Sequence, residues 1–174
     1  MTQNLVLQLL LATAMAAFTV VMHLGGLTAL IAATNRHARH LQADRTLISQ
    51  ALILVGVSFG LFTLHGVEIW AYAVLYQLLG AIRSFEDALY FSTATYSTIG
   101  YGDVALTKSW RVLGAIEGAN GVILLGWSTA FFVSVVGRIR ALEHDWSDTS
   151  GDRAHGPTNR ENQGAVPHVQ QPLP

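Results

Sequence analysis

A run of twelve residues, TATYSTIGYGDV at 93–104, places two glycines, a tyrosine and an aspartate in a row, flanked by small hydroxyl residues. In this run Gly100 and Gly102 alternate with Ile99 and Tyr101. Glycine enters the left-handed backbone region without a Cβ penalty, so alternating glycines allow successive carbonyl oxygens to turn to one side. In a soluble protein such a run would be a surface turn. Here it lies between apolar segments, which indicates that its backbone has a function.

The composition of the whole chain is that of a membrane protein. Of its 174 residues 51% are hydrophobic and 12% are charged, whereas a typical soluble domain is about a quarter charged. Residues 1–33 and 47–67 contain no Asp, Glu, Lys or Arg, a distribution typical of membrane-spanning helices. A net charge of −1 gives no indication of a nucleic-acid partner. The absence of cysteine excludes disulfides, thiolate metal sites and cysteine nucleophiles.

Three apolar segments, at 5–33, 47–79 and 109–138, each exceed the roughly 20 residues that a helix needs to cross a bilayer. The first lacks the basic start of a signal peptide and is longer than its apolar region, so we predict a retained transmembrane helix. We interpret His23, inside it, as a packing residue. The polar residues 142–174, rich in Gly, Pro, Asn and Gln, predict a disordered tail.

Basic residues predict the orientation in the membrane. The link after the first segment and the region after the third are richer in arginine than the region between the second and third. These basic residues are Arg36, Arg39 and Arg45 in the link; Arg138, Arg140, Arg153 and Arg160 after the third segment; and Arg83, Lys108 and Arg111 between the second and third. The positive-inside rule therefore places the link and the C-terminus in the cytoplasm and the N-terminus outside.

The region between the second and third segments predicts a short helix at 84–97. Ser84 followed by Asp87 resembles a capping box, and Glu86 suits the positive end of a helix. About three turns are too short to span a bilayer, and the segment is too apolar to lie free in water. Because both of its ends lie on the outer side, we predict a re-entrant helix that delivers 98–103 into a protein-lined space within the membrane.

The sequence at this point, Thr98-Ile99-Gly100-Tyr101-Gly102-Asp103, resembles the Thr-Val-Gly-Tyr-Gly-Asp signature of potassium channel pore domains. The resemblance covers roughly 47–140, in the order outer helix, pore helix, filter and inner helix, and is greatest to small bacterial pore-only channels. It implies a homotetramer, because one chain supplies one filter strand and a ring of carbonyl oxygens needs several.

The resemblance also implies a role for each filter residue. Carbonyl oxygens of the filter would bind K+ in place of water; the ion-binding set is Thr98, Ile99, Gly100 and Tyr101, with Gly102 completing the filter. Asp103 would be held by a hydrogen bond at the outer mouth, for which Tyr90 is the available aromatic donor. Ala94 stands where many relatives carry an acidic residue or valine that braces the filter.

Two further hypotheses concern the long helices. Polar residues in membrane helices usually pair, so we expect His65, Glu68 and Glu117 to form a polar cluster behind the pore helix. The alternative is that Glu68 lies in the outer headgroup region. A metal-hydrolase site at His65 and Glu68 lacks further ligands. Gly121 lies where the resemblance places a gating hinge, and the alternative is close helix packing, as we expect for Gly114, Gly118 and Gly126.

The sequence therefore predicts an all-α integral membrane protein with three transmembrane helices, a re-entrant pore helix and a selectivity-filter loop, assembled as a tetramer. Its predicted parts are a peripheral helix (1–34), a basic link (35–46), a pore domain (47–141) and the tail (142–174); within the pore domain lie the outer helix (47–79), pore helix (84–97), filter (98–103) and inner helix (109–140). The predicted function is passive conduction of K+ across the cell membrane, with no enzymatic activity and no cofactor. A weakly selective cation channel of this fold and a non-conducting membrane scaffold are the alternatives.

Overall fold

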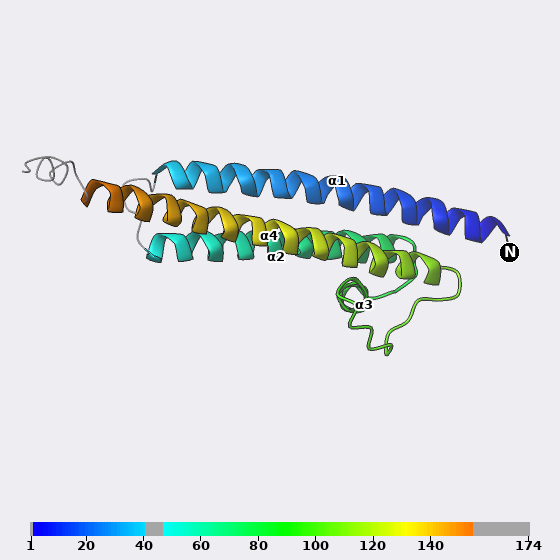
Figure 1. Cartoon of the computed structure of the whole chain (residues 1–174). Helices are drawn as coiled ribbons and strands as arrows, with labels where there is room; N and C mark the ends of the chain where they lie inside the picture. Colours follow the sequence, from blue (N-terminus) through cyan, green and yellow to red (C-terminus); the bar gives the residue numbers. More distant parts are fainter. Residues whose placement is uncertain (1, 41–46, 155–174) are drawn as a thin grey trace, which may run out of the picture. The chain divides into compact units, whose positions relative to one another are not determined.

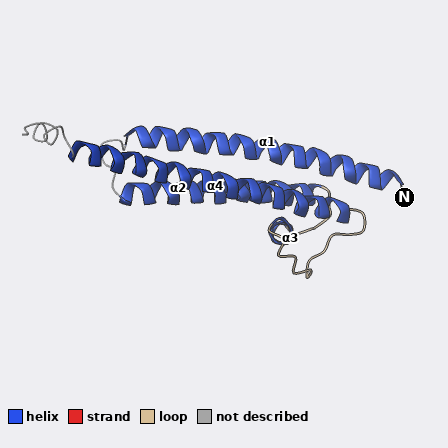
Figure 2. Ribbon diagram, viewed as in Figure 1, coloured by secondary structure: helices blue, strands red, loops and turns tan. Residues whose placement is uncertain are grey.

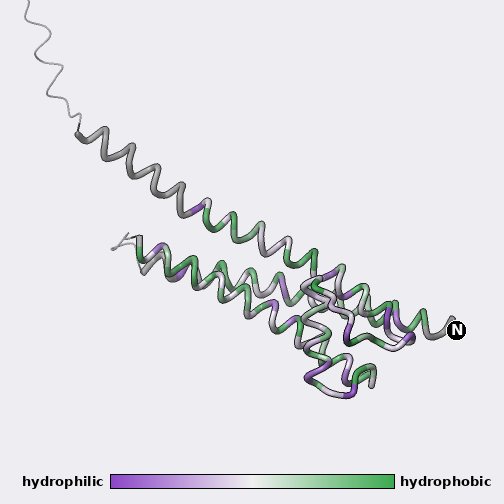
Figure 3. Tube along the Cα trace, turned by 90° about the horizontal axis from the view of Figure 1, so that it is seen from below, coloured by the Kyte–Doolittle hydropathy of each residue, from purple (hydrophilic) through white to green (hydrophobic). Residues whose placement is uncertain are grey.

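The computed structural model describes residues 2–40 and 47–154, and in these ranges it is helical with connecting loops and no strand (Figure 2). The helices are α1 (Thr2–His40), α2 (Leu47–Leu78), α3 (Phe85–Tyr96) and α4 (Arg111–Ala154). Three segments are long and apolar enough to cross a membrane: Leu5–Arg36, Ile48–Leu78 and Arg111–Arg138. Apolar residues recur along these helices, interrupted by polar positions (Figure 3).

The chain divides into two compact units, Met1–Val135 and Val136–Pro174. The first holds α1, α2, α3 and most of the apolar part of α4, and every contact below lies within it. In this unit α2 contacts both α1 and α3. Figure 1 shows α3 as a short helix followed by the loop that leads to α4.

Two predicted boundaries are wrong. Residues 35–40, predicted as part of a link, continue α1, and residues 142–154, predicted as disordered, continue α4. Neither stretch contains a proline, and arginine, alanine, leucine and glutamate all favour helix. Polarity alone therefore did not mark the ends of these helices. The rest of the predicted link (41–46) and of the tail (155–174) lies outside the described residues.

The packing of α1 against α2 depends on two glycines and two leucines. The side chain of Leu64 on α2 fills the space beside Gly26 on α1, and Leu30 on α1 fills the space beside Gly60 on α2. A Cβ at either glycine would overlap the opposite leucine. Small residues at such contacts let membrane helices approach closely, and α1 packs against α2 in this way.

The short helix α3 begins at the cap that the sequence predicts. Ser84 adopts an extended conformation and its side chain accepts a hydrogen bond from the backbone N–H of Asp87 at 3.4 Å. Behind α3 lies a core that includes the fully buried side chains of Tyr72, Tyr76 and Leu113. This core fixes α3 between α2 and α4.

One face of α4 approaches α3 through three glycines. Gly114, Gly118 and Gly121 have neighbours on α3; these are the side chain of Phe91, the carbonyl oxygen of Thr95 and the carbonyl oxygen of Tyr96, respectively. The spacing of four and three residues places the glycines on one side of the helix. The geometry therefore gives Gly121 a packing role, whereas a Cβ at Gly126 would have no neighbour within 4 Å in the described part of the chain.

Candidate functional site

The loop after α3 has an alternating backbone. Thr98, Gly100 and Gly102 have φ angles of 61°, 54° and 79°, while Ile99 and Tyr101 between them are not in the positive-φ region. Thr98 is the non-glycine residue with positive φ within the described ranges. Such a residue costs energy to hold in this conformation, so the surrounding structure must favour it.

Backbone hydrogen bonds tie the start of this loop to the end of α3. The N–H of Thr98 donates to the carbonyl of Thr95 at 3.1 Å, and the N–H of Gly100 donates to the carbonyl of Ala94 at 3.0 Å. Ala94 has no side chain able to brace the loop by a hydrogen bond. The structure shows that its backbone carbonyl contacts the loop instead.

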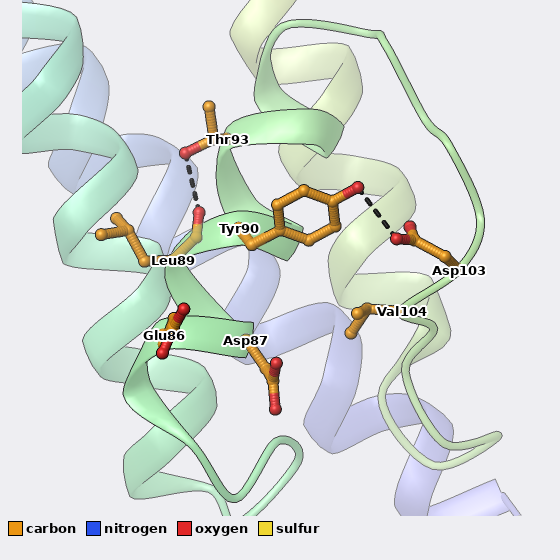
Figure 4. Close-up of a pocket in the computed structure, with 7 residues that line it drawn as sticks. All are labelled: Glu86, Asp87, Leu89, Tyr90, Thr93, Asp103 and Val104. Atoms are coloured by element: carbon orange, nitrogen blue, oxygen red, sulfur yellow. Dashed lines mark hydrogen bonds between the residues drawn. The ribbon is translucent and has the colours of Figure 1, made fainter.

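Tyr90 and Asp103 connect the far end of the loop to α3 (Figure 4). The Tyr90 hydroxyl donates a hydrogen bond to Asp103 Oδ2 at 2.9 Å. Because the phenol gives its proton to a carboxylate, this bond raises the pKa of Tyr90 above its usual value. The rings of Tyr90 and Tyr101 stack at 6.4 Å with an 11° angle between their planes. Tyr90 therefore supports two loop residues.

A pocket beside Tyr90 is acidic. The acidic residues among those that line it are Glu86 and Asp87 in the first turn of α3, and Asp103 in the loop. The rest of the lining is apolar, aromatic or hydroxyl-bearing, and none of it is basic (Figure 4). A surface lined by charges of one sign raises the local concentration of the opposite ion, in this case cations.

Loop side chains are exposed in the single chain. Ile99 is 55% exposed and Tyr101 is 71% exposed. Both are large apolar or aromatic side chains at a position between membrane-length helices. The loop with the alternating backbone is therefore uncovered in the single chain.

Behind α3 lies a group of polar side chains from all the described helices, centred on Glu68. His23 Nδ1 lies 2.8 Å from Glu68 Oε1, and His65 Nδ1 lies 3.1 Å from Glu68 Oε2. The Tyr96 hydroxyl donates to Glu68 Oε2, and Ser128 Oγ lies 2.8 Å from His65 Nε2. His23 and Glu68 are fully buried. The sequence-predicted pair His65 and Glu68 is thus brought together.

Glu117 belongs to a different hydrogen-bonded group. The Tyr76 hydroxyl and the Ser92 hydroxyl each donate to one Glu117 oxygen at 2.5 Å. Ser92 Oγ also lies 2.9 Å from the carbonyl oxygen of Ile69. Within the described residues no hydrogen bond joins Glu117 to His65 or Glu68, so the three residues do not form the single hydrogen-bonded cluster that the sequence suggested.

A third contact joins α1 to α4. The Asn120 side-chain amide donates to Thr19 Oγ1 at 2.8 Å and to the Tyr72 hydroxyl at 3.3 Å. Together with His23, these contacts show that α1 is hydrogen-bonded to the interior of the unit. Its role is thus more than the peripheral packing that the sequence predicted.

The group around Glu68 contains residue types that can bind metals. Ligand atoms of His23, His65 and Glu68 lie within 4.8 Å of one another. Each of them already has a hydrogen-bond partner, and no buried side-chain nitrogen or oxygen in the described part of the chain is unpartnered. The arrangement is therefore complete without a metal ion, and we do not assign one.

Five members of these groups were not predicted from the sequence: His23, Tyr96, Ser128, Tyr76 and Ser92. Their partners lie 23 to 105 residues away along the chain. One available signal was polarity itself, because His23 and Ser128 stand inside apolar spans where polar residues usually pair.

Comparison with known proteins gave one match. Residues 62–138, which include the end of α2, α3, the loop and the apolar part of α4, match a family model described as "Ion channel". No curated protein and no solved structure matched the chain. The match supports an ion-channel pore domain in this region, and ion transport rather than catalysis as the activity.

Proposed function

We propose that the chain forms a potassium-selective channel whose filter is residues 98–102. The observation that carries the proposal is the alternation of φ along Thr98, Gly100 and Gly102, in the loop directly after α3. In a regular strand successive carbonyls point to opposite sides. Alternation between residues with positive φ and residues without it instead turns successive carbonyls toward the same side, where they can replace the water around K+.

The surroundings of the loop support a cation rather than an anion. The last residue of α3 is Tyr96, so the negative end of the helix dipole lies next to Thr98. In addition, Glu86, Asp87 and Asp103 line the acidic pocket. Both features lower the electrostatic energy of a cation at the loop.

A homotetramer is the assembly we propose. One chain provides one strand of carbonyls, and a ring around an ion requires several copies related by a closed symmetry. The exposure of Ile99 and Tyr101 supports this, because neighbouring copies would cover both. In that assembly α3 and the loop would be re-entrant, since non-helical backbone in a membrane must be buried in protein or line water.

The proposed location is the cell membrane, with the loop facing outside. The basic residues at the C-terminal end of α1 and near the end of the third apolar segment favour the cytoplasm for those ends. This orientation puts the N-terminus and the acidic pocket on the outer side.

A flux assay with two glycine variants tests the proposal. Gly100 and Gly80 both have positive φ, 54° and 62°, and neither would place a Cβ within 4 Å of another described atom. Gly100→Ser and Gly80→Ser therefore impose similar backbone strain, but only Gly100 is in the loop. Purified protein in potassium-loaded liposomes should release K+ as wild type and as Gly80→Ser, and release should be lost in Gly100→Ser.

The other outcomes distinguish the alternatives. Equal release from sodium-loaded and potassium-loaded liposomes would favour a weakly selective cation channel. A potassium ionophore, added at the end, shows whether the liposomes were loaded with K+. If loaded liposomes that contain the wild-type protein release no K+ before the ionophore is added, a non-conducting scaffold is favoured. Release that persists in Gly100→Ser would mean that the loop is not the filter.

A further inference from the structure

Three successive contacts join one face of α1 to one face of α2. They pair His23 with Glu68, Gly26 with Leu64, and Leu30 with Gly60. Positions spaced by three and four residues lie on the same side of a helix, so the three contacts form one antiparallel interface. The two packing contacts fix the register of α1 on α2. In this register His23 lies opposite Glu68, and both side chains are fully buried.

The two carboxylate oxygens of Glu68 have different partners. Oε1 lies 2.8 Å from His23 Nδ1, and within the described residues His23 is its hydrogen-bond partner. Oε2 accepts a hydrogen bond from the Tyr96 hydroxyl and lies 3.1 Å from His65 Nδ1. Because His65 belongs to α2, as Glu68 does, it does not tie the carboxylate to another helix. Through His23, α1 therefore holds the oxygen opposite the one that binds Tyr96.

The contact at Oε1 also determines where Oε2 lies. A carboxylate group is planar, so fixing one of its oxygens restricts the rotation that would carry the other oxygen away from Tyr96. Without His23, Oε1 would be a buried acceptor with no partner, which is costly enough to turn the carboxylate toward another donor. His23 therefore fixes the acceptor that the Tyr96 hydroxyl reaches.

Tyr96 connects this contact to the loop. It is the last residue of α3, its side chain is almost fully buried, and its backbone lies against Gly121 of α4. The N–H groups of Thr98 and Gly100 donate to carbonyl oxygens in the last turn of α3. The first hydrogen bonds of the loop therefore depend on the turn of α3 that Tyr96 holds in place.

Thr98 makes this support necessary. Its φ of 61° lies in the left-handed region, and a residue with a Cβ stays there when its surroundings favour that conformation. Thr98 comes two residues after Tyr96, so the end of α3 is the part of the structure that sets its direction. The alternating backbone that follows requires a fixed end of α3.

We propose that His23 is a positioning residue for the filter: through Glu68 and Tyr96, it fixes the end of α3 from which the loop starts. Describing the loop as a filter rests on the proposed function, whereas the positioning of the loop does not. In this role α1 acts on the loop through α2 and α3, and it is a working part of the channel subunit.

Amide hydrogen exchange tests the positioning without any measurement of transport. The readout is exchange at residues 97–100, where three backbone N–H groups donate to carbonyls of α3, measured by mass spectrometry on the full chain in detergent. His23→Phe keeps an aromatic ring and removes both ring nitrogens. Thr19→Val is the matched control, because it removes a hydrogen bond between α1 and α4 that does not involve Glu68.

Exchange at 97–100 should rise about three- to tenfold in His23→Phe, the factor that corresponds to losing one hydrogen bond between membrane helices. It should stay at the wild-type level in Thr19→Val. Equal exchange in these two variants would overturn the proposal, because it would show a general loosening of α1.

A double variant tests the route through Tyr96. Tyr96→Phe lacks the hydroxyl that binds Glu68, so its exchange at 97–100 should already be raised. Adding His23→Phe to Tyr96→Phe should then raise exchange no further. Additive increases would mean that His23 acts by another route, and the proposal would fail.

Two milder variants decide the question if His23→Phe does not assemble. An Asn amide lies the same number of bonds from Cα as Nδ1 of His23, whereas a Gln amide reaches the position of Nε2. His23→Asn should therefore keep the contact with Glu68 and exchange as wild type does, and His23→Gln should exchange faster at 97–100. The same exchange rate in both would overturn the proposal.

The consequence for selectivity rests on the proposed function. His23→Phe should lower the ratio of K+ to Na+ permeability, and Thr19→Val should leave it as in wild type; an unchanged ratio in His23→Phe would overturn this consequence. The flux assay with Gly100→Ser tests the filter itself. A failure of the filter assignment and a failure of the positioning role are therefore seen in different experiments.

Discussion

Gly121 of α4 lies directly against the carbonyl oxygen and the ring of Tyr96, the last residue of α3. The absence of a side chain at this position lets α4 support α3 at the point where the loop begins. The resemblance favoured a hinge at Gly121, whereas the structure gives this residue a close contact with Tyr96.

A methyl group at Gly121 should therefore destabilise the protein. Gly121→Ala adds an atom that overlaps the Tyr96 backbone, and forced overpacking typically costs about 1–3 kcal/mol. Helix propensity opposes this by up to about 1 kcal/mol in favour of alanine. We expect a net fall in the thermal unfolding midpoint in detergent. Gly126→Ala is the control, because the described part of the chain leaves room for a Cβ there, and its unfolding midpoint should not fall. If Gly121→Ala and Gly126→Ala unfold at the same midpoint, the packing role of Gly121 is refuted.

The hydrogen bond from Tyr90 to Asp103 should stabilise the conducting form of the loop. Tyr90→Phe removes the donor while keeping the ring that stacks on Tyr101. We expect fewer open channels in single-channel recordings, with the ratio of K+ to Na+ permeability retained. Asp103→Asn, which keeps an oxygen that can accept the bond, should have a smaller effect than Asp103→Ala. Identical behaviour of the two Asp103 variants would show that this acceptor has no role.

The same bond predicts an alkaline titration. Because Asp103 raises the pKa of Tyr90, the folded state holds this proton more tightly than the unfolded chain does. The contribution of the bond to stability is therefore present below pH 10, the usual phenol value, and is lost as pH rises through the higher folded pKa. Absorbance of phenolate, measured as wild type minus Tyr90→Phe, should rise with a midpoint above 10. A midpoint at or below that value would contradict the bond.

The hydrogen bond between Asn120 and Thr19 should stabilise the packing of α1 against α4. A double-mutant cycle with Asn120→Ala and Thr19→Val isolates this pair. Hydrogen bonds between membrane helices average about 0.6 kcal/mol and reach about 1.7 kcal/mol, so we expect a coupling energy in that range. The measurement is the free energy of unfolding in detergent for the four proteins. A coupling energy of zero would mean that α1 is held by apolar packing alone.

Local features of the fold were predictable from the sequence. Three apolar segments gave the membrane-length helices, and Ser84 with Asp87 gave the start of α3, because both signals lie within a few residues of what they determine. The ends of α1 and α4 were not predictable from polarity, since a polar stretch without proline can still be helical.

The backbone of the loop was predictable where glycine permits an unusual conformation. The positive φ of Gly100 and Gly102 is open to glycine without a Cβ penalty, whereas that of Thr98 is imposed by its surroundings and has no sequence signal. Contacts such as that between His23 and Glu68, 45 residues apart, depend on how the helices are rotated against one another. That rotation is set by packing such as Leu64 against Gly26, which spacing along one helix cannot reveal.

The central claim is that residues 98–102 select potassium. The most direct test is the reversal potential of purified protein in a planar bilayer with potassium on one side and sodium on the other, with Gly100→Ser and Gly80→Ser measured in parallel. We predict a potential close to the potassium equilibrium value for wild type and Gly80→Ser, and no current for Gly100→Ser. A potential near zero in wild type, with current present, would contradict potassium selectivity.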